Sequence, residues 1–424
     1  LNYSYDSKHL FTFTYRADGS DKFGSGNRFG FFPSAAYSWV VVDNKYTANE
    51  SAFNFAKLRL SYGATGNDRI SSHRYLARLE NTYYDGELGA SPSSQANENL
   101  KWETTYQYNL GVDFGFFNDA ITASIDVYKK ETKDLLMPIP IPGRTGYSNQ
   151  WQNIGRVDNQ GIEFQISSKN FNKGNLKWNT DFNIASNQNK IVKLGNVDFI
   201  PVTVPGGWIQ DVGRLTVGRS IGEAYGYDFD GVYQVDDFTW QNGSDSSIPH
   251  GERTYTLKND VVAVNGVNVS PGSHKFKDLN GDNIINLDDD RKHISRSNPI
   301  LFGGLTNSFK YKKFDLNVFL QGSYGNEIFN EAKYRYGDYG DRNATGTLAS
   351  SYYVEDASFL RLQSISVGYT LDSDLLDKVN LNNARIYVTA NNIYTWTKYT
   401  GFDPELDSGD KLMSGVDRIT YPRS

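Results

Sequence analysis

Cysteine is absent from the 424 residues of the chain, which excludes disulfide bonds, thiolate metal sites and cysteine nucleophiles at once. Histidine is scarce: 5 residues are scattered along the chain, with neither an HExxH motif nor a close histidine–carboxylate spacing. The glycine-rich segment 24–30 lacks the GxGxxG interval and joins two expected strands, so it does not predict a phosphate-binding loop. We therefore expect neither an enzyme nor an organic cofactor.

Two further absences concern membranes and nucleic acids. No run of about 18 apolar residues occurs, so no transmembrane helix is predicted. The formal net charge of −6 has the wrong sign for a nucleic-acid-binding protein, and we expect no nucleic-acid partner. No secretory signal precedes the strand-like sequence that begins at Leu1, so we expect a processed chain or a piece of a longer protein.

Aromatic residues, in contrast, are abundant: they make up 14% of the chain and recur at alternate positions. Between Lys101 and Phe116 the odd positions are mostly polar, whereas the even positions carry Trp102, Thr104, Tyr106, Tyr108, Leu110, Val112, Phe114 and Phe116. This period predicts one strand with an apolar and a polar face. It is far longer than the usual strand of about five or six residues.

The same alternation recurs along the chain and predicts about eleven strands. We place them near 2–16, 27–42, 53–63, 101–116, 118–132, 157–168, 175–187, 300–311, 313–323, 357–371 and 383–396. Near Gln363 the apolar phase changes from even to odd positions, which predicts a β-bulge.

The connections between these strands alternate in length. Short or modest ones are expected at 43–52, 117, 169–174, 312 and 372–382, and long polar ones at 64–100, 133–156, 188–299, 324–356 and from 397 onward. Short turns at one end and long loops at the other are typical of a transmembrane β-barrel of the outer membrane, with the long loops outside the cell.

A soluble all-β sandwich or propeller is the alternative fold. Its interior face would be uniformly aliphatic, with strands of about six residues. Here the polar face carries charged residues in mid-strand, among them Arg59 and Asp113, which a dry core would not tolerate. A wet or plugged lumen accepts them, so the alternation favours the barrel.

One segment has the spacing of a calcium-binding loop. Positions 1, 3, 5, 7, 9 and 12 of an EF-hand-like loop are occupied by Asp278, Asn280, Asp282, Ile284, Asn286 and Asp289. Such a loop supplies converging oxygen ligands, which Ca²⁺ prefers, and we predict a structural Ca²⁺. The departures are Asn283 at position 6, normally glycine, and the short Asp289 at position 12, normally glutamate. An acidic, solvated turn without metal is the alternative.

The 188–299 segment also contains aromatic residues among acids and amides. Aromatic faces beside hydrogen-bonding groups suit recognition of a sugar, a peptide or a partner protein. The alternative is that these aromatics pack a small core within the loop itself. The residues concerned are Trp208, Tyr225, Tyr227, Tyr233 and Trp240.

Several short phrases resemble the SusC/RagA family of TonB-dependent outer-membrane transporters from Bacteroidetes. Asn97–Thr105 reads NENLKWETT and resembles the family's NPNLKWETT. Five further phrases follow in the family's order, at Asn153–Glu163, Asp230–Gln234, Lys277–Asp282, Ser358–Leu362 and Tyr399–Glu405. They span most of the chain, and together they are specific although each alone is weak.

The resemblance implies a 22-stranded barrel with an N-terminal plug and a TonB-interaction segment. Residues 1–424 are then expected to be a C-terminal barrel fragment of about 11 strands, lacking the plug and the final strand, with 188–299 as a large extracellular loop insertion. The barrel would contact outer-membrane lipid, and TonB would act through the missing N-terminal region.

The resemblance also implies a function. Family members import oligosaccharides or peptides together with a SusD-like surface lipoprotein that covers the barrel. Two other functions remain open: a SusC-like barrel that serves as a scaffold subunit without transport, and a simple diffusion porin. A porin is disfavoured because it would not need an extracellular loop of about 110 residues.

Overall fold

The protein is described by a computed structural model that covers residues 1–44, 52–202, 212–240, 247–337, 345, 348–371, 384–405 and 411–417. It divides into two compact units. The wall unit comprises residues 1–198, 301–321 and 362–394, and the loop unit comprises 199–300, 322–361 and 395–424. No helix among the described residues is long and apolar enough to cross a membrane.

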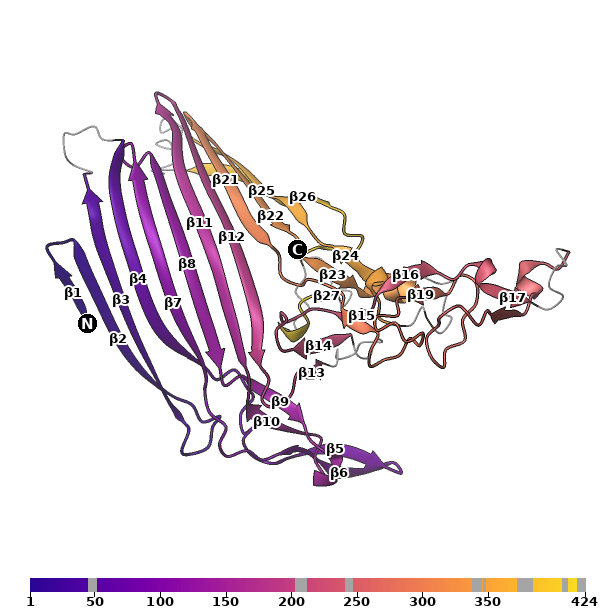
Figure 1. Cartoon of the computed structure of the whole chain (residues 1–424). Helices are drawn as coiled ribbons and strands as arrows, with labels where there is room; N and C mark the ends of the chain where they lie inside the picture. Colours follow the sequence, from indigo (N-terminus) through magenta and orange to yellow (C-terminus); the bar gives the residue numbers. More distant parts are fainter. Residues whose placement is uncertain are drawn as a thin grey trace. The chain divides into compact units, whose positions relative to one another are not determined.

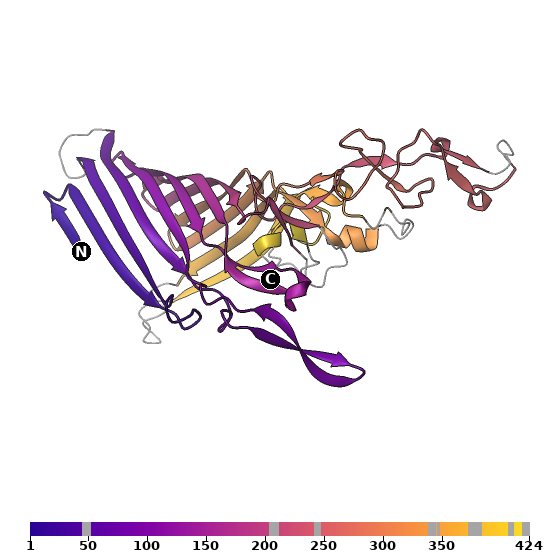
Figure 2. The ribbon, with the colours of Figure 1, turned by 60° about the horizontal axis from the view of Figure 1, so that its bottom comes forward.

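A sheet of twelve strands, most of them long, dominates the structure (Figure 1). Its strands follow one another in chain order, and from β1 to β21 each pairs antiparallel with the next. The sheet is curved but open (Figure 2), as expected for part of a barrel wall. Its strands are β1 (Asn2–Tyr5), β2 (His9–Gly19), β3 (Phe29–Asp43), β4 (Phe53–Asn67), β7 (Glu103–Phe116), β8 (Ile121–Lys133), β11 (Arg156–Lys173), β12 (Leu176–Lys193), β21 (Leu301–Tyr311), β22 (Phe314–Tyr324), β25 (Phe359–Thr370) and β26 (Arg385–Thr397).

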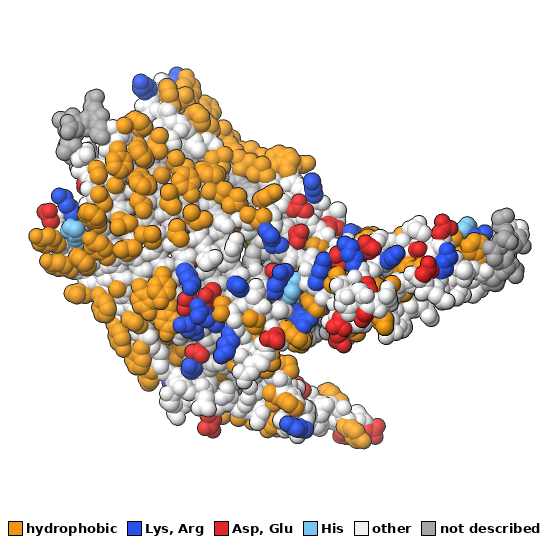
Figure 3. Space-filling view, viewed as in Figure 1, with side chains coloured by type: hydrophobic (Ala, Val, Ile, Leu, Met, Phe, Trp, Pro, Cys, Tyr) orange, Lys and Arg blue, Asp and Glu red, His pale blue; other side chains and the backbone are white. Residues whose placement is uncertain are grey.

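The two faces of this sheet differ as the alternation predicts. Register places Leu60, Leu110, Val127 and Ile162 in one row across four strands, and each keeps between 43% and 50% of its surface exposed. We call this side the apolar face; its large side chains cover much of the sheet in Figure 3. Exposed apolar side chains over so wide a surface are suited to lipid and not to water.

Charged side chains lie on the opposite, polar face. Arg59 is held there between Asp113 and Asp126, with hydrogen bonds of 2.8–2.9 Å to both carboxylates. A Cβ on Gly111 would lie only 2.5 Å from an Asp126 carboxylate oxygen and 2.6 Å from the Arg59 guanidinium carbon. Glycine at this position therefore provides the space that the three charged groups occupy.

The ends of the sheet also differ. At the turn end, β7 and β8 are joined through Phe117, Asn118 and Asp119, whose φ angles of 54–59° lie in the left-handed region. The connection between β21 and β22 is shorter still and consists of Lys312, with φ of 53°, and Lys313. At the loop end the long connections leave the sheet, as predicted.

The strand expected near 2–16 is in fact two strands, β1 and β2, joined by a tight turn. Tyr5 pairs with His9, and Asp6 and Ser7 have φ near 50°. The turn has three residues, so odd positions lie on the same face before and after it. The alternation therefore continues through the hairpin, which made it look like one strand.

Two long connections expected to be irregular instead form a second sheet. Its four strands are β5 (Arg78–Tyr84), β6 (Glu87–Gln95), β9 (Leu136–Pro140) and β10 (Asn149–Asn153). The expected end of the strand near 187 is also too early, because β12 continues to Lys193. The phase change near Gln363 is present: Leu360 and Val367, seven positions apart, are both 48% exposed.

The loop unit consists of short strands around several small cores. A small one contains Ile328, Ala357 and Tyr399, and two others are larger. Of these two, one contains Val212, Ala224, Phe329, Tyr353, Met413 and Val416, and the other contains Tyr227, Val264, Phe276 and Ile285. Its small strands are β13 (Phe199–Val202), β14 (Gly213–Thr216), β15 (Tyr225–Tyr227), β16 (Phe229–Val232), β17 (Phe238–Trp240), β18 (Tyr255–Leu257), β19 (His274–Phe276), β20 (Arg291–His293), β23 (Glu327–Asn330), β24 (Val354–Asp356) and β27 (Val416–Asp417).

Helical structure in the described residues is confined to short turns. These are 3-10 helices at Gly143–Thr145, Val235–Asp237, His250–Glu252, Ser351–Tyr353 and Lys411–Met413, and a π-helix at Lys333–Gly337.

Candidate functional site

The loop unit contains a polar cavity of about 700 Å³. Side chains of both charges line it, together with hydroxyl groups and a few apolar side chains. The charged lining comes from Arg219, Asp228, Lys292, His293, Arg296, Glu327 and Asp356. We refer to this site as the mixed-charge cavity.

Short strands bring these residues together from distant parts of the chain. β15 pairs with β20, which places Asp228 close to Lys292, 2.8 Å from its ammonium group. Lys277 approaches the same carboxylate to 3.2 Å. Burial alone would raise the pKa of Asp228, but the two ammonium groups outweigh it and hold that pKa below its ordinary value. Asp228 is therefore a carboxylate at neutral pH.

The other two acids of the lining are held by backbone groups. The Glu327 carboxylate accepts a 2.9 Å hydrogen bond from the backbone N–H of Arg296. The Asp356 carboxylate accepts one of the same length from the backbone N–H of Ser358, and the hydrogen bonds from Ser358 lower its pKa. Lys292 and Arg296 are exposed, so their charges are accessible to a ligand.

A buried carboxylate, that of Glu223, lies beside the cavity. The Glu223 carboxylate is 3.2 Å from Nδ1 of His293 and 2.9 Å from Nε of Arg219, and His293 Nε2 is 2.9 Å from the Thr216 hydroxyl. Burial would raise the pKa of Glu223, but the interactions with His293 and Arg219 lower it overall. His293 of β20 thus contacts both Thr216 of β14 and the Glu223 carboxylate, which follows β14 in the chain.

Three of the aromatic residues singled out by sequence are buried in the loop unit's own packing. Tyr227 stacks on Phe276 with ring centroids 4.9 Å apart, and Tyr233 donates a 2.8 Å hydrogen bond to the Val262 carbonyl. Tyr225 donates one of 3.0 Å to the Arg291 carbonyl. Burial raises the pKa of Tyr233 to about 12. These tyrosines fit the alternative of an internal core, since their faces are covered.

The two tryptophans differ from the tyrosines. Trp240 is half-buried at the end of the β17–β18 hairpin, where the Arg253 guanidinium lies 4.8 Å from its ring centre. Trp208 lies outside the described residues. Of the four described aromatics, Trp240 is thus the one that is not fully buried.

The predicted calcium loop is an ordered turn closed by its own side chains. The Asp278 carboxylate accepts 2.7 Å hydrogen bonds from the backbone N–H groups of Gly281 and Asn283, and Asn283 takes the left-handed conformation with φ of 64°. The buried Asp290, one position beyond Asp289, accepts from the N–H groups of Leu279 and Asn286. Among the described residues no three His, Cys, Asp or Glu side chains gather as a metal site would require. Calcium binding remains a prediction.

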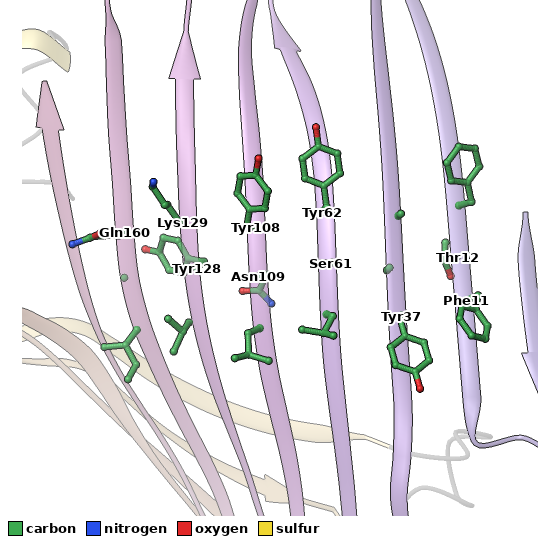
Figure 4. Close-up of a pocket in the computed structure, with 18 of the residues that line it drawn as sticks. Phe11, Thr12, Tyr37, Ser61, Tyr62, Tyr108, Asn109, Tyr128, Lys129 and Gln160 are labelled. Atoms are coloured by element: carbon green, nitrogen blue, oxygen red, sulfur yellow. The ribbon is translucent and has the colours of Figure 1, made fainter. Parts of the chain in front are cut away.

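A second hollow lies on the apolar face of the wall unit. This apolar groove has a volume of about 1080 Å³ and is lined across β1 to β12 mainly by aromatic and aliphatic side chains. Figure 4 shows Tyr62 and Tyr108 next to each other on neighbouring strands, with Lys129 and Gln160 further along. Its surface matches lipid chains better than a polar cargo.

Two of the sequence phrases meet in the loop unit. Arg361, only 5% exposed, pairs with Asp403 and lies 3.1 Å from the Glu405 carboxylate. The phrases Ser358–Leu362 and Tyr399–Glu405 are therefore in contact through one arginine.

Comparison with known proteins assigns the chain to a family. Residues 1–393 match the family described as "TonB dependent receptor-like, beta-barrel". The chain belongs to this family. Its members are transporters and receptors of the Gram-negative outer membrane, and they are not enzymes.

Similar proteins agree with this assignment. TonB-dependent receptor P3 of Formosa agariphila is 36% identical over the whole chain, which covers 43% of that protein. TonB-dependent receptor SusC of Bacteroides thetaiotaomicron is 31% identical, again over the whole chain and 42% of SusC. The RagAB peptide importer in the "closed-closed" state has the same fold, with a TM-score of 0.74 at 23% identity over 99% of this chain and 45% of that one. The chain thus spans less than half the length of these relatives, and the resemblance to SusC-like transporters is confirmed.

Proposed function

We propose that the complete protein imports short peptides across the outer membrane in a TonB-dependent manner, together with a SusD-like surface lipoprotein. The observation that carries import is the match of the whole chain to SusC at 31% identity. The plug and TonB segment that such import requires would lie in the part of the relatives that this chain does not span.

The mixed-charge cavity favours peptides over oligosaccharides. A short peptide carries an ammonium and a carboxylate group, and the cavity offers exposed cations, Lys292 and Arg296, beside the carboxylates of Asp228, Glu327 and Asp356. Neutral sugars are usually held by stacking on open aromatic faces. The rings of Tyr225, Tyr227 and Tyr233 are buried, so they do not offer such faces.

The first test is uptake by cells that carry the complete protein. Arg296→Gln should lower the apparent affinity for labelled short peptides about tenfold, the loss of one charged hydrogen bond of about 1.5 kcal/mol. Lys177→Gln, an exposed lysine near the turn end of the sheet, is the matched control and should leave uptake unchanged. Unaltered peptide uptake in Arg296→Gln would exclude this cavity as the peptide site. If the unaltered protein takes up oligosaccharides and no peptides, the cargo is an oligosaccharide and the proposal of peptides is wrong.

The lipoprotein partner is tested separately. Trp240 and Arg253 form a partly exposed pair on the β17–β18 hairpin, and tryptophan and arginine are enriched at protein interfaces. The double variant Trp240→Ala, Arg253→Gln should reduce copurification of the lipoprotein without preventing barrel assembly. Full copurification would show that the hairpin does not contribute to that interface.

A scaffold role without transport is the second candidate. It predicts that the complete protein still assembles with its lipoprotein while removal of TonB leaves uptake unaffected. Loss of uptake on TonB removal would exclude it.

A further inference from the structure

A group of charged side chains lies on the apolar face at its loop end. Register across four strands places the members in adjoining rows: Tyr108, Lys129, Gln160 and Gln188 in one, Tyr106, Glu131, Asp158 and Lys190 in the next, and Thr104, Lys133 and Arg156 in the last. Residues directly opposite one another in a sheet share a face. Charged side chains thus continue the same face that carries Leu110, Val127 and Ile162 (Figure 3).

The group, here called the cationic cluster, is built so that its cations face outward. The Glu131 carboxylate lies 3.0 Å from both Lys129 and Arg156 and 3.5 Å from Lys133. Asp158 pairs with Arg156 at 2.6 Å. The side chains of Glu131 and Asp158 are only 16% and 21% exposed, whereas Lys129 and Lys133 keep 48% and 45%. The carboxylates lie underneath and fix the positions of the cations.

The cluster carries an excess of positive charge. Lys129, Lys133 and Arg156 pair with the two carboxylates, and Lys190 lies opposite Asp158 in the register, which gives a net charge of 4 − 2 = +2. The whole chain has a net charge of −6, so this excess is local. A cluster of this sign attracts an anionic group.

The apolar groove begins where the cluster ends. Lys129 and Gln160 line the groove together with Tyr62, Tyr108 and Val127, and Lys129 is also a member of the cluster. The ring of Tyr106, 5.1 Å from the Lys133 ammonium group, lies between the two regions and 6.5 Å from Tyr62. An apolar groove that ends at cations complements a molecule with acyl chains and an anionic headgroup.

We propose that the cationic cluster and the apolar groove together bind one phosphate-bearing glycolipid of the outer leaflet, of the lipid A type. Its acyl chains occupy the groove, and its phosphate contacts Lys129, Lys133, Arg156 and Lys190. The proposal rests on membrane insertion with the loop end outside, and it does not depend on the cargo. The loop end is the outer end because long loops of outer-membrane barrels lie outside the cell.

The test uses the complete protein, purified in detergent, with diphosphorylated lipid A as the probe and native mass spectrometry as the measurement. The triple variant Lys129→Gln, Lys133→Gln, Lys190→Gln should lose lipid A binding by about fivefold for each lysine removed. Lys130→Gln is the matched control, because Lys130 pairs with Gln107 and Asn159 on the polar face of the same strand. It should bind lipid A as the unaltered protein does.

Three further arms make the result decisive. Lipid A without phosphate should bind the unaltered protein only weakly, with an affinity similar to that of the triple variant for phosphorylated lipid A. Inorganic phosphate should not compete with lipid A for the unaltered protein. If the triple variant fails to assemble, Lys190→Gln alone serves, since Lys190 takes part in none of the ion pairs described above. The proposal is overturned if these variants keep full affinity, if Lys130→Gln loses as much, or if inorganic phosphate displaces the lipid. Cargo uptake by the same variants should be normal, which separates this site from the proposed function.

Discussion

Removal of Arg59 should destabilise the barrel wall more than removal of any surface cation of the same sheet. Arg59 lies between Asp113 and Asp126 and donates four hydrogen bonds of 2.8–2.9 Å to the two carboxylates. In Arg59→Met the two carboxylates face one another without compensation, and the methionine keeps most of the aliphatic packing.

The magnitude follows from the partial burial of the three side chains. They are 30%, 27% and 20% exposed, between the buried and the surface case. Loss of one partner of a buried pair costs about 3–5 kcal/mol, and an exposed pair contributes about 0–1 kcal/mol. We expect a loss of about 2 kcal/mol for Arg59→Met, measured by urea unfolding of the complete protein in detergent.

Two variants control this experiment. Arg385→Met breaks a more exposed pair with the single carboxylate of Asp315, and should have a smaller effect. The triple variant Arg59→Met, Asp113→Asn, Asp126→Asn removes the uncompensated charges and should recover most of the lost stability. If Arg385→Met costs as much as Arg59→Met, or if the triple variant is no more stable than the single one, the reasoning about uncompensated carboxylates is wrong.

Three further predictions concern the faces of the sheet, pH and metal. Leu110→Arg places a charge on the apolar face and should destabilise the assembled barrel by about 2–4 kcal/mol. Ser124→Arg, on the polar face opposite Asp113, should be tolerated. Equal damage by the two variants in a heat-modifiability assay would contradict the membrane assignment. The folded-state pKa of Glu223 lies below its ordinary 4.5, so its contribution to stability is present above pH 4.5 and is lost as pH falls through the folded pKa. Proteolysis of the loop unit should thus accelerate on acidification in the unaltered protein, and less steeply in Glu223→Gln. If Ca²⁺ binds the 278–289 loop, EDTA should increase nicking there in the unaltered protein. A plain turn closed by the Asp278 carboxylate should be insensitive to EDTA.

The long strands were predictable because they are governed by a local rule. Two-residue alternation reports which face meets lipid, and it located the wall strands from β2 to β26. Two of their predicted ends, at 168 and 187, come too early, because β11 continues to Lys173 and β12 to Lys193. It failed at β1 because the turn beginning at Asp6 preserves the phase of the alternation. It also failed at β6, where Glu87–Gln95 contains glycine, proline and serine and has no β-branched or aromatic residue. The sequence does contain a hairpin signal there: the Asp85–Gly86 pair, with φ of 51° and 82°, forms the turn between β5 and β6.

The mixed-charge cavity could not be predicted, because no local rule connects its members. Arg219 and Asp356 lie far apart in sequence, and only the pairing of short strands brings them to one cavity. The aromatic residues of the loop illustrate the same limit. A sequence pattern records that Tyr233 is aromatic, but whether its face is open depends on what folds against the ring, which here includes Phe238 and Lys275.

The order of the twelve strands has a consequence for how such a protein changes over time. Each strand of the sheet forms hydrogen bonds with the strands of the sheet that come before and after it in the chain. No strand therefore needs a distant wall strand to complete its hydrogen bonding. Insertions at the loop end leave these ladders intact, as shown by the hundred or so residues accommodated between β12 and β21, whose register remains continuous from Leu176 to Ala185. A cargo site built from these insertions can therefore diversify by lengthening, shortening or exchange, while the membrane wall keeps the same sequence constraints. The loops and the membrane wall can therefore change in sequence independently of one another, although they belong to one chain.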